Sequence, residues 1–228
     1  MSSPLTTARR TTRDLANKAA DMAAGMTPAP KRVLSNQIRT LVRRGLAARA
    51  IGEGDIVPDF ILPDVSGQPV RLNSLLERGP VVLVFYRGGW CDFCQTYLHG
   101  LQPKLFYLHE LGAELVAVSP QLPTASLLTE TTHELTFPML SDVGLSVSHR
   151  FGLVYPLPPA IQRTYREFGI DLEAANGSYP TPCLPLAATL IITPDRRVHT
   201  ASIDENPAQR LDPIDVLDAL VQIRLTRS

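Results

Sequence analysis

Residues 81–94 read VVLVFYRGGWCDFC, and this stretch carries more information about the fold than any other. Its apolar first part, residues 81–85, is typical of a central strand that is covered on both faces of a sheet. Cys91 and Cys94 follow two glycines, at the point where this strand gives way to a predicted helix. A helix N-terminus favours thiolate over thiol, and the thiolate is the reactive form of cysteine. The stretch therefore predicts a redox site at a strand-to-helix corner.

Strands and helices alternate around this corner. We expect further strands at residues 60–62, 114–119 and 137–140, and a hairpin of residues 189–193 and 198–202. Helices are expected at residues 92–111 with a break at Gly100 and Pro103, and then at residues 125–133, 144–151, 160–168 and 214–225, while the rest of residues 156–186 is expected to be irregular. This order predicts an α/β protein with a thioredoxin-like fold, a central mixed β-sheet flanked by helices.

The N-terminal part has its own character. Two helices are expected at residues 7–24 and 32–50, separated by the Thr-Pro-Ala-Pro of residues 27–30, and we divide the chain into a basic helical extension, 1–51, and a thioredoxin-like domain, 52–228. Residues 1–50 hold ten Lys or Arg and two acidic residues, whereas the remainder holds twelve basic and twenty acidic residues. This asymmetry predicts that the arm packs on its own acidic body or on a second copy in a homodimer.

Composition excludes several classes of protein. Of the 228 residues 44% are hydrophobic and 19% charged, which is typical of a globular domain. No apolar run approaches the roughly 20 residues of a membrane span, and no apolar segment marks a secretory signal. We expect a cytoplasmic protein, although an N-terminus rich in Arg, Ser and Thr also resembles a transit peptide. The basic arm has no aromatic residue to stack on bases, so we expect no nucleic-acid partner.

Several segments, in order, carry a family resemblance. They are residues 54–67 (GDIVPDFILPDVSG), 84–94 (VFYRGGWCDFC), 116–121 (VAVSPQ), 137–142 (FPMLSD) and 184–189 (LPLAAT). From about Gly52 to Leu220 the sequence resembles the peroxiredoxin-like branch of the alkyl hydroperoxide reductase C/thiol-specific antioxidant (AhpC/TSA) family, within the thioredoxin superfamily. The resemblance implies a thiol-dependent peroxidase that reduces hydrogen peroxide or organic hydroperoxides. It also implies a thioredoxin-like protein or a low-molecular-weight thiol as reductant.

The family pattern can be carried over by position. The cysteine that attacks peroxide falls on Cys94. Cys91 stands where the family has Thr or Ser, Arg87 where it has Pro, and Ala187 where a thiolate-activating arginine is usual. The resemblance thus implies a cycle in which Cys94 forms a sulfenic acid and Cys91 condenses with it to a disulfide. In a thioredoxin-type CxxC the first cysteine is the attacker, which would reverse these roles, so the sequence leaves the attacking thiol open.

Other residues near the CxxC are candidates for the same site. Arg87 could lower the thiol pKa and orient a peroxide, while Asp92 would oppose the first effect. The substrate pocket is expected to include Tyr86, Gly88, Gly89 and Trp90, although Trp90 could equally anchor the loop by packing. Cys183 is a candidate resolving cysteine, since the loop before a late strand lies near the thiols in thioredoxin-like folds; it could also be a packing residue.

Cofactors and metals are not expected. The five histidines are scattered, and the sequence has no second CxxC, no HxxxH and no haem-attachment CxxCH. It also has no phosphate-binding or dinucleotide glycine motif. Two alternatives to a peroxidase stay open. One is a protein thiol–disulfide oxidoreductase that never meets peroxide, and the other is a redox-sensing or binding module without turnover.

Overall fold

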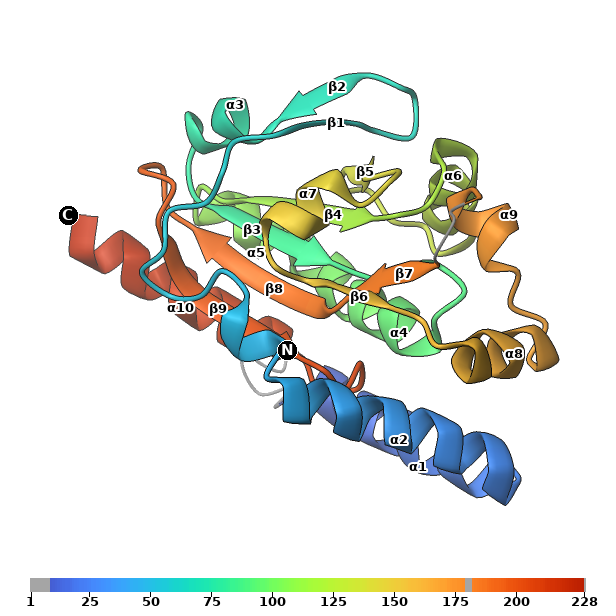
Figure 1. Cartoon of the computed structure of the whole chain (residues 1–228). Coiled ribbons are helices and arrows are strands. Elements are labelled where there is room, and N and C mark those ends of the chain that lie inside the picture. The colour runs from blue at the N-terminus through green and yellow to red at the C-terminus, as the bar shows by residue number, and fades with distance from the viewer. Residues whose placement is uncertain (1–8, 179–181, 228) are drawn as a thin grey trace.

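The structure is a computed structural model, and it describes residues 9–178 and 182–227. Its centre is a five-stranded sheet in the order β5-β4-β3-β8-β9 (Figure 1). In this sheet β3 is parallel to β4 and β4 to β5, whereas β8 is antiparallel to both β3 and β9. The mixed sheet predicted from the sequence is therefore confirmed. Its strands are β3 (Val81–Phe85), β4 (Glu114–Ser119), β5 (Met139–Ser141), β8 (Ala187–Ile192) and β9 (Val198–Asp204).

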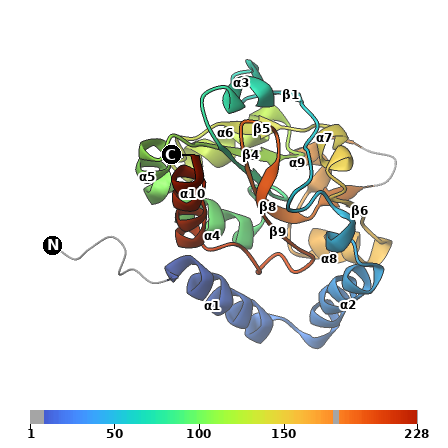
Figure 2. The same ribbon diagram turned by 90° about the vertical axis from the view of Figure 1, so that its left-hand side faces the viewer.

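Helices cover both faces of this sheet (Figures 1 and 2). One face packs on α1, α4, α5 and α10, and the other on α2, α3, α7 and α8. The bounds are α1 (Arg10–Gly25), α2 (Pro28–Arg44), α3 (Leu72–Leu76), α4 (Asp92–Leu101), α5 (Leu105–Glu110), α6 (Pro123–Thr132), α7 (Ser146–Arg150), α8 (Pro159–Glu167), α9 (Leu172–Asn176) and α10 (Pro213–Arg227), with short 3-10 turns at η2 (Ala47–Arg49) and η3 (Gln102–Lys104).

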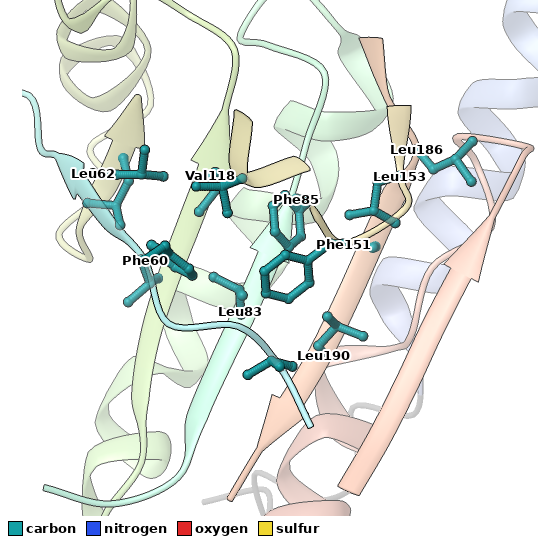
Figure 3. Close-up of a cluster of buried hydrophobic side chains, with 14 of the residues drawn as sticks. Phe60, Leu62, Leu83, Phe85, Val118, Phe151, Leu153, Leu186 and Leu190 are labelled. Atoms are coloured by element: carbon teal, nitrogen blue, oxygen red, sulfur yellow. The ribbon is translucent and has the colours of Figure 1, made fainter. Parts of the chain in front are cut away.

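Strand β3 is buried along its whole length, as its apolar sequence predicts. Successive side chains of a strand point to opposite faces, so Leu83 and Phe85 enter one core cluster while Val82 and Val84 enter the other. Figure 3 shows the first cluster, in which Phe85 lies against Phe151 with ring centroids 5.0 Å apart. Burial on both faces fixes the strand firmly, and with it the position of the corner that follows.

The N-terminal helices lie along one side of the body as a V (Figure 2). Helix α1 packs on α4 and α2 packs on α8. Gly100 is the point of closest approach: a Cβ there would collide with the side chain of Thr11, so this glycine allows the helices to touch. The arm also meets acidic residues of the body, with Arg9 Nη2 lying 3.1 Å from Asp215 Oδ1. The predicted packing of the arm on its own body is confirmed.

One buried carboxylate joins the arm to the last helix. Asp212 Oδ1 accepts a hydrogen bond from the backbone N–H of Ile214 at 3.0 Å, at the start of α10. Its other oxygen accepts from the backbone N–H and the hydroxyl of Thr12, at 3.0 and 2.8 Å. Asp212 therefore supplies a cap to α10 and to the first turn of α1 together. That 1–51 and 52–228 form separate units stays a prediction.

Several local predictions were wrong for identifiable reasons. The segment 27–30 is not a linker, because Pro28 and Pro30 occupy the first turn of α2, where a missing N–H costs nothing. The short antiparallel pairs β1 (Ile61–Pro63) with β2 (Pro69–Arg71), and β6 (Val154–Pro156) with β7 (Cys183–Pro185), went mostly unpredicted. Three-residue strands that contain proline give almost no periodic signal. Within the described residues, no helix is long and apolar enough to cross a membrane.

Candidate active site

The strand-to-helix corner is built as the sequence predicts. Strand β3 ends at Phe85, and α4 begins at Asp92 with Cys91 as its N-cap. Cys94 lies in the first helical turn, where unpaired backbone N–H groups point. The turn is closed by a hydrogen bond from the Cys91 N–H to the carbonyl of Gly88 at 3.1 Å. Gly88 has a φ of 143°, and a Cβ there would collide with the indole of Trp90.

The two sulfurs of the CxxC are in direct contact. Cys91 Sγ and Cys94 Sγ lie 2.9 Å apart, within hydrogen-bonding distance. Arg87 Nη2 donates to Cys91 Sγ at 2.9 Å, and Arg210 Nη2 donates to Cys94 Sγ at 3.3 Å. Each sulfur thus has a guanidinium of its own. A positive charge at this range favours the thiolate, and two of them act on one sulfur pair.

Arg87 is held by aromatic side chains beside the first sulfur. Its Nη1 donates to the hydroxyl of Tyr165 at 3.1 Å, and its guanidinium lies 5.4 Å from the centre of the Trp90 ring. Trp90 in turn packs against Tyr165, with ring centroids 5.4 Å apart. The predicted placement of Arg87 next to the CxxC is therefore correct. The aromatic pair fixes its orientation, and the Nε of Arg87 keeps a buried donor without a partner among the described residues.

Arg210 is the candidate site residue that the sequence analysis missed. It lies between β9 and α10, 116 residues from the sulfur to which it donates. Its guanidinium rests 5.3 Å from the centre of the Tyr97 ring, and burial raises the pKa of Tyr97 to about 12, so this ring stays neutral. Ala187, where the family pattern would put an arginine, is a buried β8 residue. The one signal in the sequence was the absence of that arginine, which implies that another residue supplies the positive charge near the thiols.

The two thiols differ in pKa. Burial raises both values, but at Cys94 it is outweighed by the hydrogen bond from Cys91, the charges of Arg210 and Arg87, and the backbone N–H of Arg87. The pKa of Cys94 therefore lies well below its ordinary value. At Cys91 burial and the contact with Cys94 outweigh the charge of Arg87, so its pKa lies well above. The two thiols titrate as one coupled pair, and the directions of the shifts favour the thiolate at Cys94.

The remaining predicted residues occupy different places. Tyr86 is fully buried beneath the corner, and burial raises its pKa strongly. Gly89 donates its backbone N–H to Gln121 Oε1 at 2.9 Å, and a Cβ there would collide with Thr129, so it shapes the turn. Cys183 lies in β7 opposite Pro156, and burial raises its pKa. Its part in the chemistry stays a prediction.

A cavity of about 580 Å³ reaches the corner from the side of the N-terminal helices. Arg87, Trp90 and Cys91 line it, whereas Cys94 lies behind Cys91 and has no exposed surface. Gly88 and Gly89 belong to the turn rather than to the cavity lining. Among the described residues, no three His, Cys, Asp or Glu side chains gather in a way that could hold a metal ion.

Comparison with known proteins agrees with this geometry. A model of the AhpC/TSA family matches residues 53–201, which is more than half of the chain. The chain belongs to the AhpC/TSA family. Arg210 and both N-terminal helices lie outside the matched residues. The family resemblance inferred from the sequence is thereby confirmed. Arg210, which contacts Cys94, and the N-terminal helices, which line the cavity at Cys91, are not part of the match.

Individual relatives show how far the likeness extends. Peroxiredoxin Bcp of Escherichia coli is 32% identical over 101 residues, which are 44% of this chain and 64% of that protein. The thiol-disulfide oxidoreductase ResA of Geobacillus thermodenitrificans is 34% identical over 115 residues, or 48% of this chain and 62% of that protein. The chain spans less than two thirds of the length of the curated relatives that it matches.

A solved structure supports the fold directly. The crystal structure of peroxidoxin BcpB from Mycobacterium tuberculosis has a TM-score of 0.60 and 25% sequence identity. The similarity covers 78% of this chain and 99% of that one. Together with the five-stranded mixed sheet, this confirms the predicted thioredoxin-like fold.

Proposed function

We propose that this protein is a thiol-dependent peroxidase that reduces hydroperoxides through Cys94 and Cys91. The observation that carries the proposal is the sulfur pair, 2.9 Å apart, with Arg210 on Cys94 and Arg87 on Cys91. A peroxidase of this kind needs a thiolate at neutral pH and a second thiol within bonding reach. Membership of the AhpC/TSA family and the likeness to peroxiredoxins support it.

The first step is an attack by the Cys94 thiolate on one oxygen of the peroxide. A sulfur–oxygen bond forms, the O–O bond breaks, and its electron pair leaves with the other oxygen as an alkoxide or hydroxide, which takes up a proton. Arg87 and Arg210 supply N–H donors and positive charge where negative charge passes from sulfur to oxygen. The products are the Cys94 sulfenic acid and an alcohol or water.

The second step joins the two sulfurs. Cys91 attacks the sulfur of the sulfenic acid, the S–S bond forms, and the S–O bond breaks to release hydroxide, which takes the Cys91 proton and leaves as water. The short sulfur–sulfur distance allows this step without unfolding of α4. An external dithiol protein, or two molecules of a low-molecular-weight thiol, then returns both cysteines to the reduced state and is itself oxidised to a disulfide.

Access to Cys94 requires one small motion. Cys91 lies between the cavity and Cys94, so a peroxide that enters by the cavity meets Cys91 first. Rotation of the Cys91 side chain about its Cα–Cβ bond is the smallest change that opens the way, and it stays within the ordinary rotamers of cysteine. Because Cys91 is the N-cap of α4 and not an interior helical residue, its side chain has more freedom than one packed against a preceding turn.

A second candidate function is thiol–disulfide exchange with another protein. Cys91 is buried but lines the cavity, which favours this function because a partner disulfide that enters the cavity meets Cys91 before Cys94. The likeness to ResA, named a thiol-disulfide oxidoreductase, agrees. This candidate predicts rapid reduction of protein disulfides and no peroxide reaction beyond that of a free thiol.

One assay separates the two functions. The reduced protein is mixed with hydrogen peroxide or cumene hydroperoxide in one series and with insulin in another, with a Cys91→Ser/Cys94→Ser double variant as the control. The peroxidase proposal expects peroxide consumption far above that of free thiol, absent from the double variant. Insulin reduction without peroxide consumption would favour the exchanger, and equal behaviour of the wild type and the double variant in both series would favour a non-catalytic module.

The setting of the enzyme belongs to the same proposal. We expect a cytoplasmic homodimer, in which the basic arm of one copy contributes to the contact, and no nucleic-acid partner. Light scattering on the full-length protein measures the mass, and its dependence on salt tests the role of charge in the contact. A monomer at micromolar concentration would contradict the homodimer and leave the chemistry unaffected.

A further inference from the structure

The cavity beside Cys91 has a floor of reactive groups and walls of a different chemistry. Its floor includes Arg87, Trp90 and Cys91. Its walls come from the two N-terminal helices, from the end of α8 and the residues after it, and from the loop between β9 and α10. Those walls carry mainly apolar side chains, among them Met22, Met26, Leu34, Ile38, Phe168 and Ile170.

The charged groups in the lining are largely used already by the protein. Lys31 Nζ donates to the carbonyl of Ala23 at 3.2 Å, and Glu205 Oε1 accepts from the backbone N–H of Ala47 at 2.9 Å. Arg87 is engaged by Cys91 and Tyr165. Asp92, Ser35 and Gln37 also line the cavity, but most of the lining is apolar and suits an apolar ligand better than a sugar or a nucleotide. Ligand sites of 300–1,000 Å³ with apolar walls and a few polar groups suit a small molecule with a long apolar part.

The floor offers what the walls lack. Cys91 Sγ and the Arg87 guanidinium lie there, and Arg87 Nε is a buried donor without a partner among the described residues. A hydroperoxide group needs N–H donors and a nearby sulfur, whereas its carbon chain needs an apolar surface. The two parts of the cavity match the two ends of such a molecule.

We infer that the N-terminal helical hairpin forms a binding site for the apolar chain of a long-chain alkyl hydroperoxide. The peroxide end lies at Arg87 and Cys91, and the chain lies between α1 and α2 against Met22 and Ile38. This inference rests on the proposed peroxidase function and adds a preference for long chains, set by helices outside the part of the chain that matches the family. Each methylene that leaves water for an apolar surface contributes about fourfold to the binding constant, so long chains gain strongly over short ones.

The kinetic test compares three peroxides and two variants. Ala23 faces the cavity, while Ala24, its neighbour on α1, is exposed and outside the lining, which makes Ala23→Phe and Ala24→Phe a matched pair. For the wild type we expect kcat/KM for n-dodecyl hydroperoxide to exceed that for tert-butyl hydroperoxide at least tenfold. Ala23→Phe should remove that advantage and leave the hydrogen peroxide rate within twofold, and Ala24→Phe should behave as wild type. Equal kcat/KM for both alkyl peroxides, or equal losses in both variants, would overturn the inference.

A binding test keeps this inference separate from the peroxidase proposal. Trp90 is the only tryptophan of the chain and lines the cavity, so its fluorescence reports an occupant. We expect saturable quenching by 11-bromoundecanol in the wild type and Ala24→Phe, and at least tenfold weaker binding to Ala23→Phe. Saturable quenching without any peroxide consumption would support the chain site and reject the peroxidase. Peroxide consumption with no quenching would do the reverse. If quenching of Trp90 depends on protein concentration alone, a second copy of the chain occupies the cavity and the inference is overturned.

Discussion

Each of the two sulfurs has an arginine beside it, but Cys91 and Cys94 lie in different surroundings. Cys91 and Arg87 face the cavity, lie four residues apart in the same corner, and are framed by Trp90 and Tyr165. Cys94 and Arg210 lie behind them, and Arg210 reaches its sulfur from another part of the chain. The pKa of the sulfur that lines the cavity is raised, and the pKa of the sulfur behind it is lowered. We therefore expect contact with the cavity and nucleophilicity to be divided between two adjacent sulfurs.

This division suggests how a CxxC serves peroxide chemistry. Both sulfurs are buried, so their hydrogen-bond donors act in a low dielectric, and we expect Cys94, whose pKa is lowered, to carry the charge. The outer sulfur stays protonated and near its partner, ready to condense with the oxidised form. The predictions below test the division, beginning with the largest expected effect.

The largest effect is expected from replacing the sulfurs themselves. Cys94→Ser should lower peroxide reduction by roughly a thousandfold or more, because the nucleophile is lost. Cys91→Ser should keep one rapid reaction per protein molecule and then fail to turn over with a dithiol reductant, because no resolving thiol is left. Single-turnover and steady-state peroxide consumption measure the two cases. A Cys94→Ser variant that still reacts at the wild-type rate would reverse the roles.

The next largest effect on the single-turnover rate is expected from the two arginines, which should differ from each other. Arg210→Met should lower the single-turnover rate about a hundredfold, because it removes a donor from the attacking sulfur where charge changes most. Arg87→Met should act more weakly on the Cys94 pKa, since its side-chain contact is with Cys91. The exposed Arg78, paired with Glu114, supplies the control Arg78→Met. If Arg210→Met reacts like this control, the second guanidinium has no role in the chemistry.

The pH dependence should follow the lowered pKa of Cys94. Only the thiolate reacts, so the rate rises as pH passes upward through this pKa and is constant above it. Since the folded value lies well below that of an ordinary cysteine, the rate should already be constant at neutral pH. In Cys91→Ala the thiolate loses a donor, and the curve should move to higher pH. Stopped-flow rates measured from acid to alkaline pH give both curves. A midpoint of the wild-type rate curve at about pH 8.5 would show an unperturbed thiol.

The smallest effect is expected from Tyr97, whose ring lies against the Arg210 guanidinium. Tyr97→Leu removes the ring beneath the guanidinium, and the lost cation–π contact should lower the single-turnover rate roughly twofold to tenfold. Tyr97→Phe keeps the ring and loses the hydrogen bond to Thr189, so it separates the two contributions. A loss in Tyr97→Phe as large as in Tyr97→Leu would assign the effect to the hydroxyl.

The sequence predicted three of the four residues at the sulfur pair and missed the fourth, Arg210. Arg87, Cys91 and Cys94 are close along the chain, and the strand and helix that hold them have strong patterns. Arg210 could not be predicted in the same way, because its position depends on the path of the irregular loop that brings it to Cys94 at the start of α4. Gly100 is a comparable case. Its sequence context correctly predicted the break between α4 and α5, but did not show that it lets Thr11 approach.

The assignment of the attacking sulfur is tested most directly by mapping its oxidation product. Cys91→Ser and Cys94→Ser are each treated with one equivalent of hydrogen peroxide in the presence of dimedone, which traps sulfenic acids, and the modified peptides are identified by mass spectrometry. The account predicts nearly complete trapping on Cys94 in Cys91→Ser and almost none on Cys91 in Cys94→Ser. Rapid and complete trapping on Cys91 in Cys94→Ser would contradict it.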